Sequence, residues 1–342
     1  MCGSCSNENA FKVAYIARQR KLRGGGAKGA EFTPEEMESV MRNSPPGAPH
    51  LSVLSFDGGF HGRTMACLSV TYSKEIHKMD IPQLDWPKAQ YPRYKYPLEQ
   101  NEGYNQAQDK ECLQSVESRI KEWTAKGCPV AAAIVEPIQA EGGDHYGSPN
   151  FFRQLQQLCK KEEVTFIVDE VQTGAGPTGD FWAHEHWNLP EPPDMVTFSK
   201  KMLTGGFYYK PELRVLEPYR IFNTWMGDPQ KLILLEAVLT VIKRDTLLEN
   251  TKRAGEKLLT GLRSLQKSHT SVFNARGLGT FLALDAQTPQ LRDEICGKAL
   301  SQGLHMGGCG DKSIRFRPAL IFQEKHAEIT LDRLDQTLKE IK

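Results

Sequence analysis

The sequence has almost no net charge and few cysteines. Its 342 residues include 43 lysines and arginines against 42 aspartates and glutamates, which gives a formal net charge of +1. Because no global field draws such a chain towards nucleic acid or an anionic membrane, neither partner is expected. Eight cysteines are too few for a disulfide framework in a chain of this length, so the composition indicates a reducing compartment and mostly buried thiols.

Long apolar runs and targeting signals are also lacking. No stretch approaches the roughly 20 apolar residues of a membrane span. The first residues resemble neither an arginine-rich transit peptide nor the apolar core of a signal peptide, so the sequence itself gives no location. With 39% hydrophobic residues the chain has enough apolar surface for a large core, and its length suggests two domains or one large domain with an appendage.

Two short apolar runs predict buried parallel strands. The first covers 130–135 and stops at Glu136-Pro137, and the second covers 164–168 and stops at Asp169-Glu170. Neither run alternates with polar residues, which is typical of a strand covered on both faces. The helical pattern "NFFRQLQQLCKKE" lies between them and completes a βαβ unit. Ligands bind at the carboxyl ends of such strands, where both acidic pairs lie.

The rest of the chain predicts further elements around this unit. An exposed basic loop is expected over 18–30 and a long irregular connection over 80–110. Strands are expected in "APHLSVLSF", "DMVTFSK", "ARGLGTFLALDA" and "SIRFRPAL". Apolar residues at helical spacing predict long amphipathic helices over 231–266. We therefore place a domain boundary near 230, with a large domain over 1–230 and a smaller C-terminal α/β domain over 231–342.

Three features of the sequence match parts of a pyridoxal phosphate site. Asp169 ends one strand, Lys200 ends the next before a glycine pair, and a Gly3-Ser4 loop precedes a helix. On spacing alone, a structural ion pair between Asp169 and Lys200 explains the first two equally well. The opening Cys2-Gly3-Ser4-Cys5 is a weak signal by itself, compatible with zinc, with redox chemistry or with coincidence.

Several motifs together resemble the class III pyridoxal-phosphate-dependent aminotransferases, which have the fold-type I architecture. The motifs are "VEPIQAEGGD", "VDEVQTGAGPTG", "FSKKMLTGG" and "CGDKSIRFRPAL". Others, among them "CGSCSNENAFK", "FHGRTM", "FWAHEHW" and "RIFNTWMGDP", narrow the resemblance to the animal 4-aminobutyrate aminotransferases within that family. The resemblance implies a mostly parallel sheet flanked by helices, followed by a smaller C-terminal α/β domain. Members carry a long segment before the phosphate loop, so we expect this chain to be truncated and its sheet to lack the N-terminal elements.

The resemblance assigns the cofactor-binding and catalytic residues. Lys200 matches the Schiff-base lysine, and we favour it over the adjacent Lys201 from its spacing to Asp169 and Thr224. Asp169 matches the carboxylate that keeps the pyridine nitrogen protonated, which makes the ring an electron sink. The other cofactor-binding residues are assigned to the phosphate (Gly3, Ser4, and Thr224 in the partner subunit), the ring face (Val171) and the phenolic oxygen (Gln172).

Two arginines are assigned to substrate carboxylates. Arg63 matches the arginine that binds the carboxylate distal to the reacting amine, with Phe60 beside it. Arg315 matches the arginine that binds the α-carboxylate of glutamate, and the family pairs it with a glutamate, here Glu141, when 4-aminobutyrate is bound. Glu136 is expected to brace the site.

The resemblance also implies partners and a second cofactor. Cys2 and Cys5 match ligands of a [2Fe–2S] cluster shared between the two subunits of a homodimer, two cysteines from each chain. The implied location is the mitochondrial matrix. His184 and His186 have the spacing of metal ligands on a strand, but we interpret them as packed structural histidines.

The predicted function is transfer of the amino group of 4-aminobutyrate to 2-oxoglutarate by a ping-pong mechanism, giving succinate semialdehyde and glutamate. Two alternatives remain open. One is a transaminase for another ω-amino acid such as β-alanine, and the other is a truncated chain without catalytic activity.

Overall fold

The computed structural model describes residues 2–25 and 31–341. The end of the basic stretch, 26–30, lies outside these residues. The predicted loop over 18–30 is wrong in its first part, because α1 (Gly3–Leu22) continues to Leu22. Arg20, within this last turn, is buried, and its Nη1 donates a hydrogen bond to the backbone oxygen of Arg214 at 2.7 Å. This tertiary contact stabilises a helical end that the basic, polar sequence did not predict.

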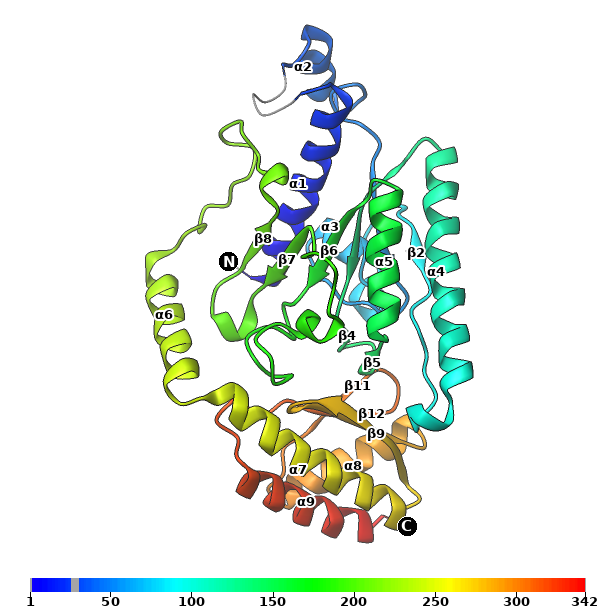
Figure 1. The fold of residues 1–342 in the computed structure, drawn as a ribbon, viewed down its shortest axis with the longest axis vertical. Helices are drawn as coiled ribbons and strands as arrows, with labels where there is room; N and C mark the ends of the chain where they lie inside the picture. The colour runs from blue at the N-terminus through cyan, green and yellow to red at the C-terminus, as the bar shows by residue number, and fades with distance from the viewer. Residues whose placement is uncertain (1, 26–30, 342) are drawn as a thin grey trace.

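A six-stranded sheet, called here the main sheet, lies at the centre of the molecule (Figure 1). Its order is β2-β1-β3-β6-β7-β8, and every neighbouring pair is parallel except the antiparallel β7–β8 pair at one edge. The strands are β1 (Ser52–Phe56), β2 (Lys88–Ala89), β3 (Val130–Val135), β6 (Thr165–Asp169), β7 (Met195–Phe198) and β8 (Gly206–Tyr209). The α/β class and the predicted βαβ unit are confirmed.

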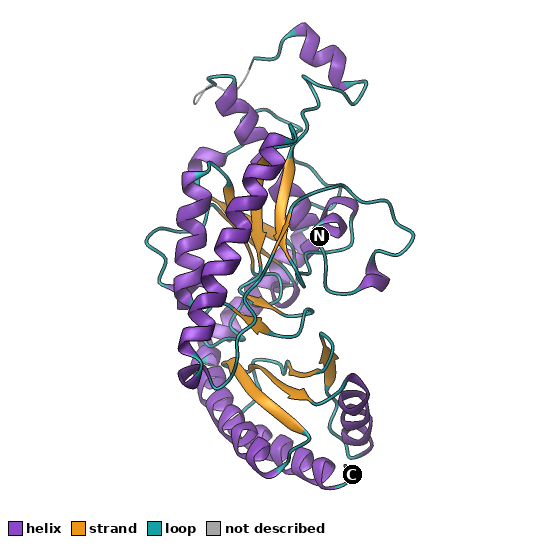
Figure 2. Cartoon of the chain, turned by 90° about the vertical axis from the view of Figure 1, so that its right-hand side faces the viewer, coloured by secondary structure: helices purple, strands orange, loops and turns teal. Residues whose placement is uncertain are grey.

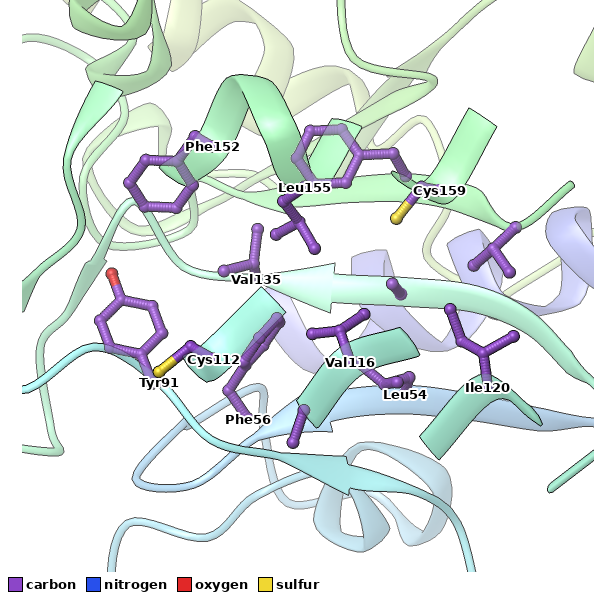
Figure 3. Close-up of a cluster of buried hydrophobic side chains, with 14 of the residues drawn as sticks. Leu54, Phe56, Tyr91, Cys112, Val116, Ile120, Val135, Phe152, Leu155 and Cys159 are labelled. Atoms are coloured by element: carbon purple, nitrogen blue, oxygen red, sulfur yellow. The ribbon is translucent and has the colours of Figure 1, made fainter. Parts of the chain in front are cut away.

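Helices cover both faces of the main sheet, which explains why its central strands show no polar alternation. Successive strand residues point to opposite faces, so Ile134 packs in the cluster that contains Phe11 of α1. Val135 packs instead with residues of α4 (Glu102–Ala125) and α5 (Pro149–Lys161). Figure 3 shows this second cluster, with Val116 and Leu155 reaching the sheet from those two helices. The predicted irregular connection over 80–110 therefore ends earlier, where α4 begins.

A second, antiparallel sheet of order β11-β12-β10-β9 lies below the main sheet (Figure 2). It consists of β9 (Val272–Leu278), β10 (Phe281–Ala286), β11 (Gly307–Cys309) and β12 (Ser313–Phe316). The single strand predicted for "ARGLGTFLALDA" is wrong, since this stretch forms a hairpin of β9 and β10. Gly279 has a φ of 52°, and the Cβ of any other residue there would lie 2.6 Å from the backbone of Pro177. The glycine that looked like part of a strand is thus needed for the turn.

The C-terminal part of the chain is rich in long helices. They are α6 (Pro229–Arg244), α7 (Leu247–Ser268), α8 (Pro289–Ser301) and α9 (Glu324–Lys339), so the predicted helices over 231–266 are confirmed. α7 buries one side against the sheet, whereas α6 buries only Ile242 and leaves most of its leucines exposed. No helix within the described ranges is both long and apolar enough to cross a membrane. The proposed domain boundary near 230 falls at the start of α6, between the two sheets.

Short elements complete the chain. They are α2 (Pro34–Val40), α3 (Met65–Ser69), β4 (Ile138–Gln139), β5 (His145–Tyr146) and the 3₁₀ helices η1 (Glu75–His77), η2 (Leu98–Gln100), η3 (Ala183–Trp187), η4 (Lys200–Met202) and η5 (Pro211–Leu213).

Candidate active site

A cavity of about 450 Å³ lies where the carboxyl ends of the parallel strands meet the start of α1. Most of the cofactor-binding residues expected from the sequence line it, and it also contains Asn7 and His61. The lining residues are Cys2, Gly3, Ser4, Asn7, Phe60, His61, Gly62, Glu136, Asp169, Val171, Gln172, Ser199, Lys200 and Leu203. Segments as distant as 2–7 and 199–203 therefore form one site, at the edge of the sheet where ligands bind in such folds.

The beginning of α1 presents free backbone N–H groups to this cavity. No side chain caps the helix at Cys2, and its first turn holds no acidic residue. The N-terminus of a 20-residue helix with unpaired amides attracts an anion. A Cβ on Gly3 would lie 2.5 Å from Cγ1 of Val171, so the helix approaches the end of β6 as closely as glycine allows. Ser4 adds a hydroxyl, which accepts a hydrogen bond from the backbone N–H of Arg63 at 3.2 Å.

Asp169 is held rigidly at the end of β6. Its side chain is 4% exposed, and Oδ2 accepts a hydrogen bond from Nδ2 of Asn7 at 2.9 Å. Nδ1 of His61 lies 2.8 Å from the same oxygen, and Oδ1 accepts the backbone N–H of Val171 at 3.0 Å. Donors compensate the cost of burying the carboxylate, so no lysine partner is needed. The sequence analysis missed Asn7 and gave His61 no definite role.

The side-chain amide of Asn7 is only partly satisfied by hydrogen bonds. Its Nδ2 also donates to the backbone oxygen of His61 at 2.8 Å, whereas its Oδ1 is buried without any hydrogen-bond partner. A buried amide oxygen without a donor is costly and normally meets a ligand or water. Asn7 lines the cavity, but its Oδ1 itself is enclosed by protein.

The two adjacent lysines have different surroundings. Lys200 lines the cavity and has a φ of 49°, an uncommon backbone conformation for a residue other than glycine. Lys201 does not line it, and its Nζ donates to the backbone oxygen of Gln172 at 3.3 Å. Burial, helped by the positive charges of Arg317 and Lys200, lowers the pKa of Lys201 to about 8. The cavity therefore distinguishes two residues that the sequence places side by side.

Of the substrate-binding candidates, Phe60 and Glu136 line the cavity. Arg63, Arg315 and Glu141 do not. Nη1 of Arg315 on β12 and Oε1 of Glu141 form an ion pair at 2.6 Å, with side chains 30% and 24% exposed. Burial acts to raise the pKa of Glu141, but the charges of Arg315 and then Lys200 outweigh it and lower the pKa. Arg63 is exposed, lies 5.9 Å from the ring centre of Phe60, and has no carboxylate partner within residues 2–25 and 31–341.

The pKa of Glu136 shifts in the opposite direction to that of Glu141. Glu136 is buried, its Oε1 accepts the backbone N–H of Phe60 at 2.8 Å, and its Oε2 accepts that of Ala140 at 3.3 Å. Burial and the negative charge of Asp169 raise the pKa of Glu136 well above its ordinary value. These bonds fix the loop of Phe60 to the residue that follows β3.

Cys2 and Cys5 lie together at the surface. Their sulfur atoms are 3.7 Å apart. Burial acts to raise the pKa of Cys2, but hydrogen bonds from Cys5 and Ser4 outweigh it and lower the pKa. In the described part of the chain no cluster of three or more His, Cys, Asp or Glu side chains could hold a metal ion.

Thr224 lies outside the cavity and is exposed. The residue before it, Asn223, accepts a hydrogen bond from Nδ2 of Asn9 at 2.5 Å, which fixes this loop to α1. Exposed apolar side chains surround it, including Phe222, Trp225 and Met226.

The histidines of "FWAHEHW" lie on the 3₁₀ helix η3, so the strand spacing considered for them is wrong. Nδ1 of His184 lies 2.9 Å from buried Glu170, and Nδ1 of His186 lies 3.3 Å from Asp180.

A larger hollow of about 1440 Å³ lies between the segment before α4 and strand β9, and contains none of the expected site residues. Three of its polar side chains bond with one another. Tyr94 bonds to Asp109, and Oγ of Ser148 donates to the same carboxylate at 2.6 Å. We therefore place the chemistry in the smaller cavity.

Comparison with known proteins identifies the family to which the sequence is similar. Residues 1–338 match the family described as Aminotransferase class-III. The chain is 56% identical to a probable mitochondrial 4-aminobutyrate aminotransferase of Caenorhabditis elegans, over 99% of this chain and 70% of that protein. It is 51% identical to the mitochondrial 4-aminobutyrate aminotransferase of Sus scrofa, over 100% of this chain and 68% of the relative.

Solved structures extend the comparison to the fold. A lysine aminotransferase from M. tuberculosis superposes with a TM-score of 0.86 at 27% identity, covering 99% of this chain and 74% of that one. An ornithine aminotransferase from Toxoplasma gondii gives a TM-score of 0.75 at 20% identity, over 98% and 71% of the two chains, and supports the fold alone.

Proposed function

This chain belongs to the class III aminotransferases, and on that premise we propose that it moves the amino group of 4-aminobutyrate to 2-oxoglutarate. The products are succinate semialdehyde and glutamate, formed in two half-reactions that share one site. The observation that carries the proposal is the cavity in which an uncapped helix N-terminus, the buried Asp169 and Lys200 converge. Each of the three meets a different part of one phosphorylated pyridine cofactor.

The residues present fit pyridoxal phosphate, the cofactor of this family. The free amides at Gly3 and Ser4 suit its phosphate, and Asp169 suits a protonated ring nitrogen. Val171 is available for the ring face and Gln172 for the phenolic oxygen. When bound, the cofactor supplies an electron sink for the carbon that bears the amino group.

Lys200 and Asp169 divide the proton chemistry between them. The Lys200 amine would hold the cofactor and would carry a proton to and from the substrate carbon that bears the amino group, as general base and acid. Asp169 would face the ring nitrogen and accept the hydrogen bond of its proton. Asn7 and His61 hold the Asp169 carboxylate in place through their contacts with Oδ2.

Substrate selection uses the two arginines in different ways. Arg63, which has no carboxylate partner in the described ranges, binds the carboxylate distal to the amine in either substrate. Arg315 binds the α-carboxylate that 2-oxoglutarate and glutamate carry and 4-aminobutyrate lacks. With 4-aminobutyrate bound, Glu141 neutralises Arg315, as in the ion pair observed at 2.6 Å. Glu136 braces the loop of Phe60 through the backbone N–H that its Oε1 accepts.

We further propose that the enzyme acts as a homodimer. The exposed apolar residues of the segment 219–239 form a surface that a second copy would bury, and exposed Thr224 within it would reach the partner's phosphate site. Two such chains would bring four thiolates together, from Cys2 and Cys5 of each, enough for a [2Fe–2S] cluster. Since the relatives are named mitochondrial, we propose the mitochondrial matrix as the location.

The function is tested by supplying the purified chain with pyridoxal phosphate and 2-oxoglutarate and measuring glutamate formed from competing amino donors. We expect 4-aminobutyrate to be the best donor, ahead of β-alanine, ornithine and lysine. Lys200→Ala, which lacks the proposed proton carrier, is the control for uncatalysed transfer. Preference for ornithine or lysine would refute the assigned substrate, and no glutamate from any donor would refute activity of this chain.

A further inference from the structure

Two ion pairs, not one, join the loop between β4 and β5 to the end of β12. Glu141 pairs with Arg315, and three residues further along the loop Asp144 pairs with Arg317. The two arginines are two residues apart, the spacing that places side chains on the same side of an extended chain. The pairs differ in burial, since the Asp144 side chain is fully buried and that of Arg317 is 19% exposed, whereas Glu141 and Arg315 are 24% and 30% exposed.

The buried pair belongs to a rigid junction. Nε of Arg276 on β9 donates to the backbone oxygen of Asp144 at 2.9 Å, and its Nη2 donates to that of Gly143 at 2.7 Å. The backbone N–H of Gly310 donates to the backbone oxygen of Glu141 at 2.9 Å. A Cβ on Gly310 would lie 2.7 Å from the backbone of Gly142, so the two segments are in direct backbone contact.

Arg317 extends the junction towards the cofactor residues. Its guanidinium lies 3.2 Å from the ring centre of Phe281, and its Nη1 donates to the backbone oxygen of Phe316 at 2.8 Å. Its Nε lies 3.4 Å from Oε1 of Gln172, a residue of the cavity. Arg317 is thus fixed by contacts on several sides, while Arg315 has Glu141 as its ion-pair partner.

We propose that the Asp144–Arg317 pair is a positioning device for Arg315. It holds β12 against the loop, so that Arg315 stays at the site when Glu141 releases it to a substrate α-carboxylate. The inference rests on the proposed function, and it adds two residues that determine specificity for one of the two substrates.

Loosening the Asp144–Arg317 pair should affect only the half-reaction with 2-oxoglutarate. 2-Oxoglutarate needs Arg315 for its α-carboxylate, whereas 4-aminobutyrate has no such group and leaves Arg315 with Glu141. A loosened junction therefore weakens the binding of 2-oxoglutarate and leaves the binding of 4-aminobutyrate unchanged. A pair that only stabilised the fold would affect both substrates alike.

The experiment uses Asp144→Asn in the protein carrying pyridoxal phosphate. Asp144 has a φ of 53°, a conformation that asparagine adopts readily, so the substitution removes charge with little change of shape. Arg317→Lys is the second variant, because it keeps the charge and loses the planar fork. Lys257→Met is the control. It breaks an exposed ion pair with Glu328 among the helices beside the same sheet.

The two half-reactions are followed separately by rapid mixing, through the absorbance of the bound cofactor, and the unfolding temperature of each variant is recorded. For Asp144→Asn we expect the apparent affinity for 2-oxoglutarate to fall about tenfold or more, as misplacement of a binding group by a fraction of an ångström produces. The affinity for 4-aminobutyrate should change less than about twofold, and Arg317→Lys should show the same asymmetry in a folded protein. Lys257→Met should change neither.

Equal losses in both half-reactions, or unchanged affinity for 2-oxoglutarate in both folded variants, would overturn the inference. If Asp144→Asn does not fold, Arg317→Lys decides by the same criteria. Failure of the proposed function would look different, because the unaltered protein would then show no half-reaction with 4-aminobutyrate.

Discussion

The charge of Lys201 is expected to destabilise the folded protein, the opposite of what is expected for the charge of most lysines. Its ammonium group is largely removed from solvent, and its hydrogen-bond acceptor is a backbone oxygen, 3.3 Å away on Gln172. Burial and the neighbouring charges of Arg317 and Lys200 lower its pKa from 10.5 to about 8. The folded protein therefore binds this proton less tightly than the unfolded chain does.

The pH window follows from these two values. Between about pH 8 and pH 10.5 the unfolded chain holds the proton and the folded protein does not, so the free energy of unfolding rises with pH across that interval. Below pH 8 both states are charged and the full cost of burying the ammonium group is present. A shift of about 2.5 pKa units corresponds to about 3 kcal/mol, which partial exposure reduces to roughly 2 kcal/mol.

Lys201→Met tests this reasoning, since methionine keeps most of the apolar stem and removes the charge. We expect the cofactor-free variant to be more stable than the unaltered protein by about 2 kcal/mol at pH 7, and the gain to shrink as pH approaches 10.5. Urea unfolding at pH 7 and pH 10, measured by circular dichroism, gives the comparison. A loss of stability at pH 7, or a difference independent of pH, would refute the argument.

Lys210→Met is the matched control for that experiment. Lys210 follows β8 at the edge of the same sheet, and its Nζ lies 2.8 Å from Asp194 and 3.0 Å from Glu191. Burial acts to lower the pKa of Lys210, but these carboxylates outweigh it and raise the pKa. This charge stabilises the folded state, so its removal should lower the stability where removal of Lys201 raises it.

Three further predictions concern the site. Borohydride reduction of the protein with pyridoxal phosphate should attach the cofactor to Lys200 in both the unaltered protein and Lys201→Met, as read by peptide mass spectrometry; attachment to Lys201 would reverse the assignment. Arg63→Ala should weaken the binding of 4-aminobutyrate and of 2-oxoglutarate alike in steady-state assays. Weaker binding of 2-oxoglutarate alone would mean that Arg63 and Arg315 exchange roles. Gly3→Ala, whose Cβ would lie 2.5 Å from Val171, should lower the affinity for pyridoxal phosphate about tenfold by displacing the start of α1, measured by fluorescence titration; unchanged affinity would argue against the phosphate site.

The parts of the fold that the sequence predicts are those decided by local patterns. The apolar runs of β3 and β6 need cover on two faces, and the helical pattern between them supplies part of it, so the βαβ unit follows from the chain itself. The errors arise where a distant contact decides. The last turn of α1 is fixed by the bond from Arg20 to Arg214, and the turn between β9 and β10 by the close approach of Gly279 to Pro177.

The residues of the site divide in the same way, into those that local patterns predict and those that distant contacts determine. Asp169 and Lys200 stand at strand ends and can be found from the sequence, but the residues that orient the carboxylate cannot. Asn7 is 162 residues from Asp169 and His61 is 108 residues from it, and neither lies in a pattern that points to the other. Lys201 illustrates the limit most directly, because adjacent identical side chains differ only in what the folded chain puts around them.

If Arg315 and Glu141 have the proposed roles, the two ion pairs between the loop and β12 would let one site serve substrates that differ by a carboxylate. A partly exposed pair such as Glu141–Arg315 contributes roughly 0–1 kcal/mol, so a substrate carboxylate can replace Glu141 at little cost. Breaking a buried pair by loss of one partner costs about 3–5 kcal/mol, so Asp144–Arg317 stays closed under the same conditions. Exchange at Arg315 therefore requires no separation of the loop from the sheet. If both pairs were buried, the α-carboxylate could not compete with Glu141, and if both were exposed, Arg315 would have no fixed position from which to bind it.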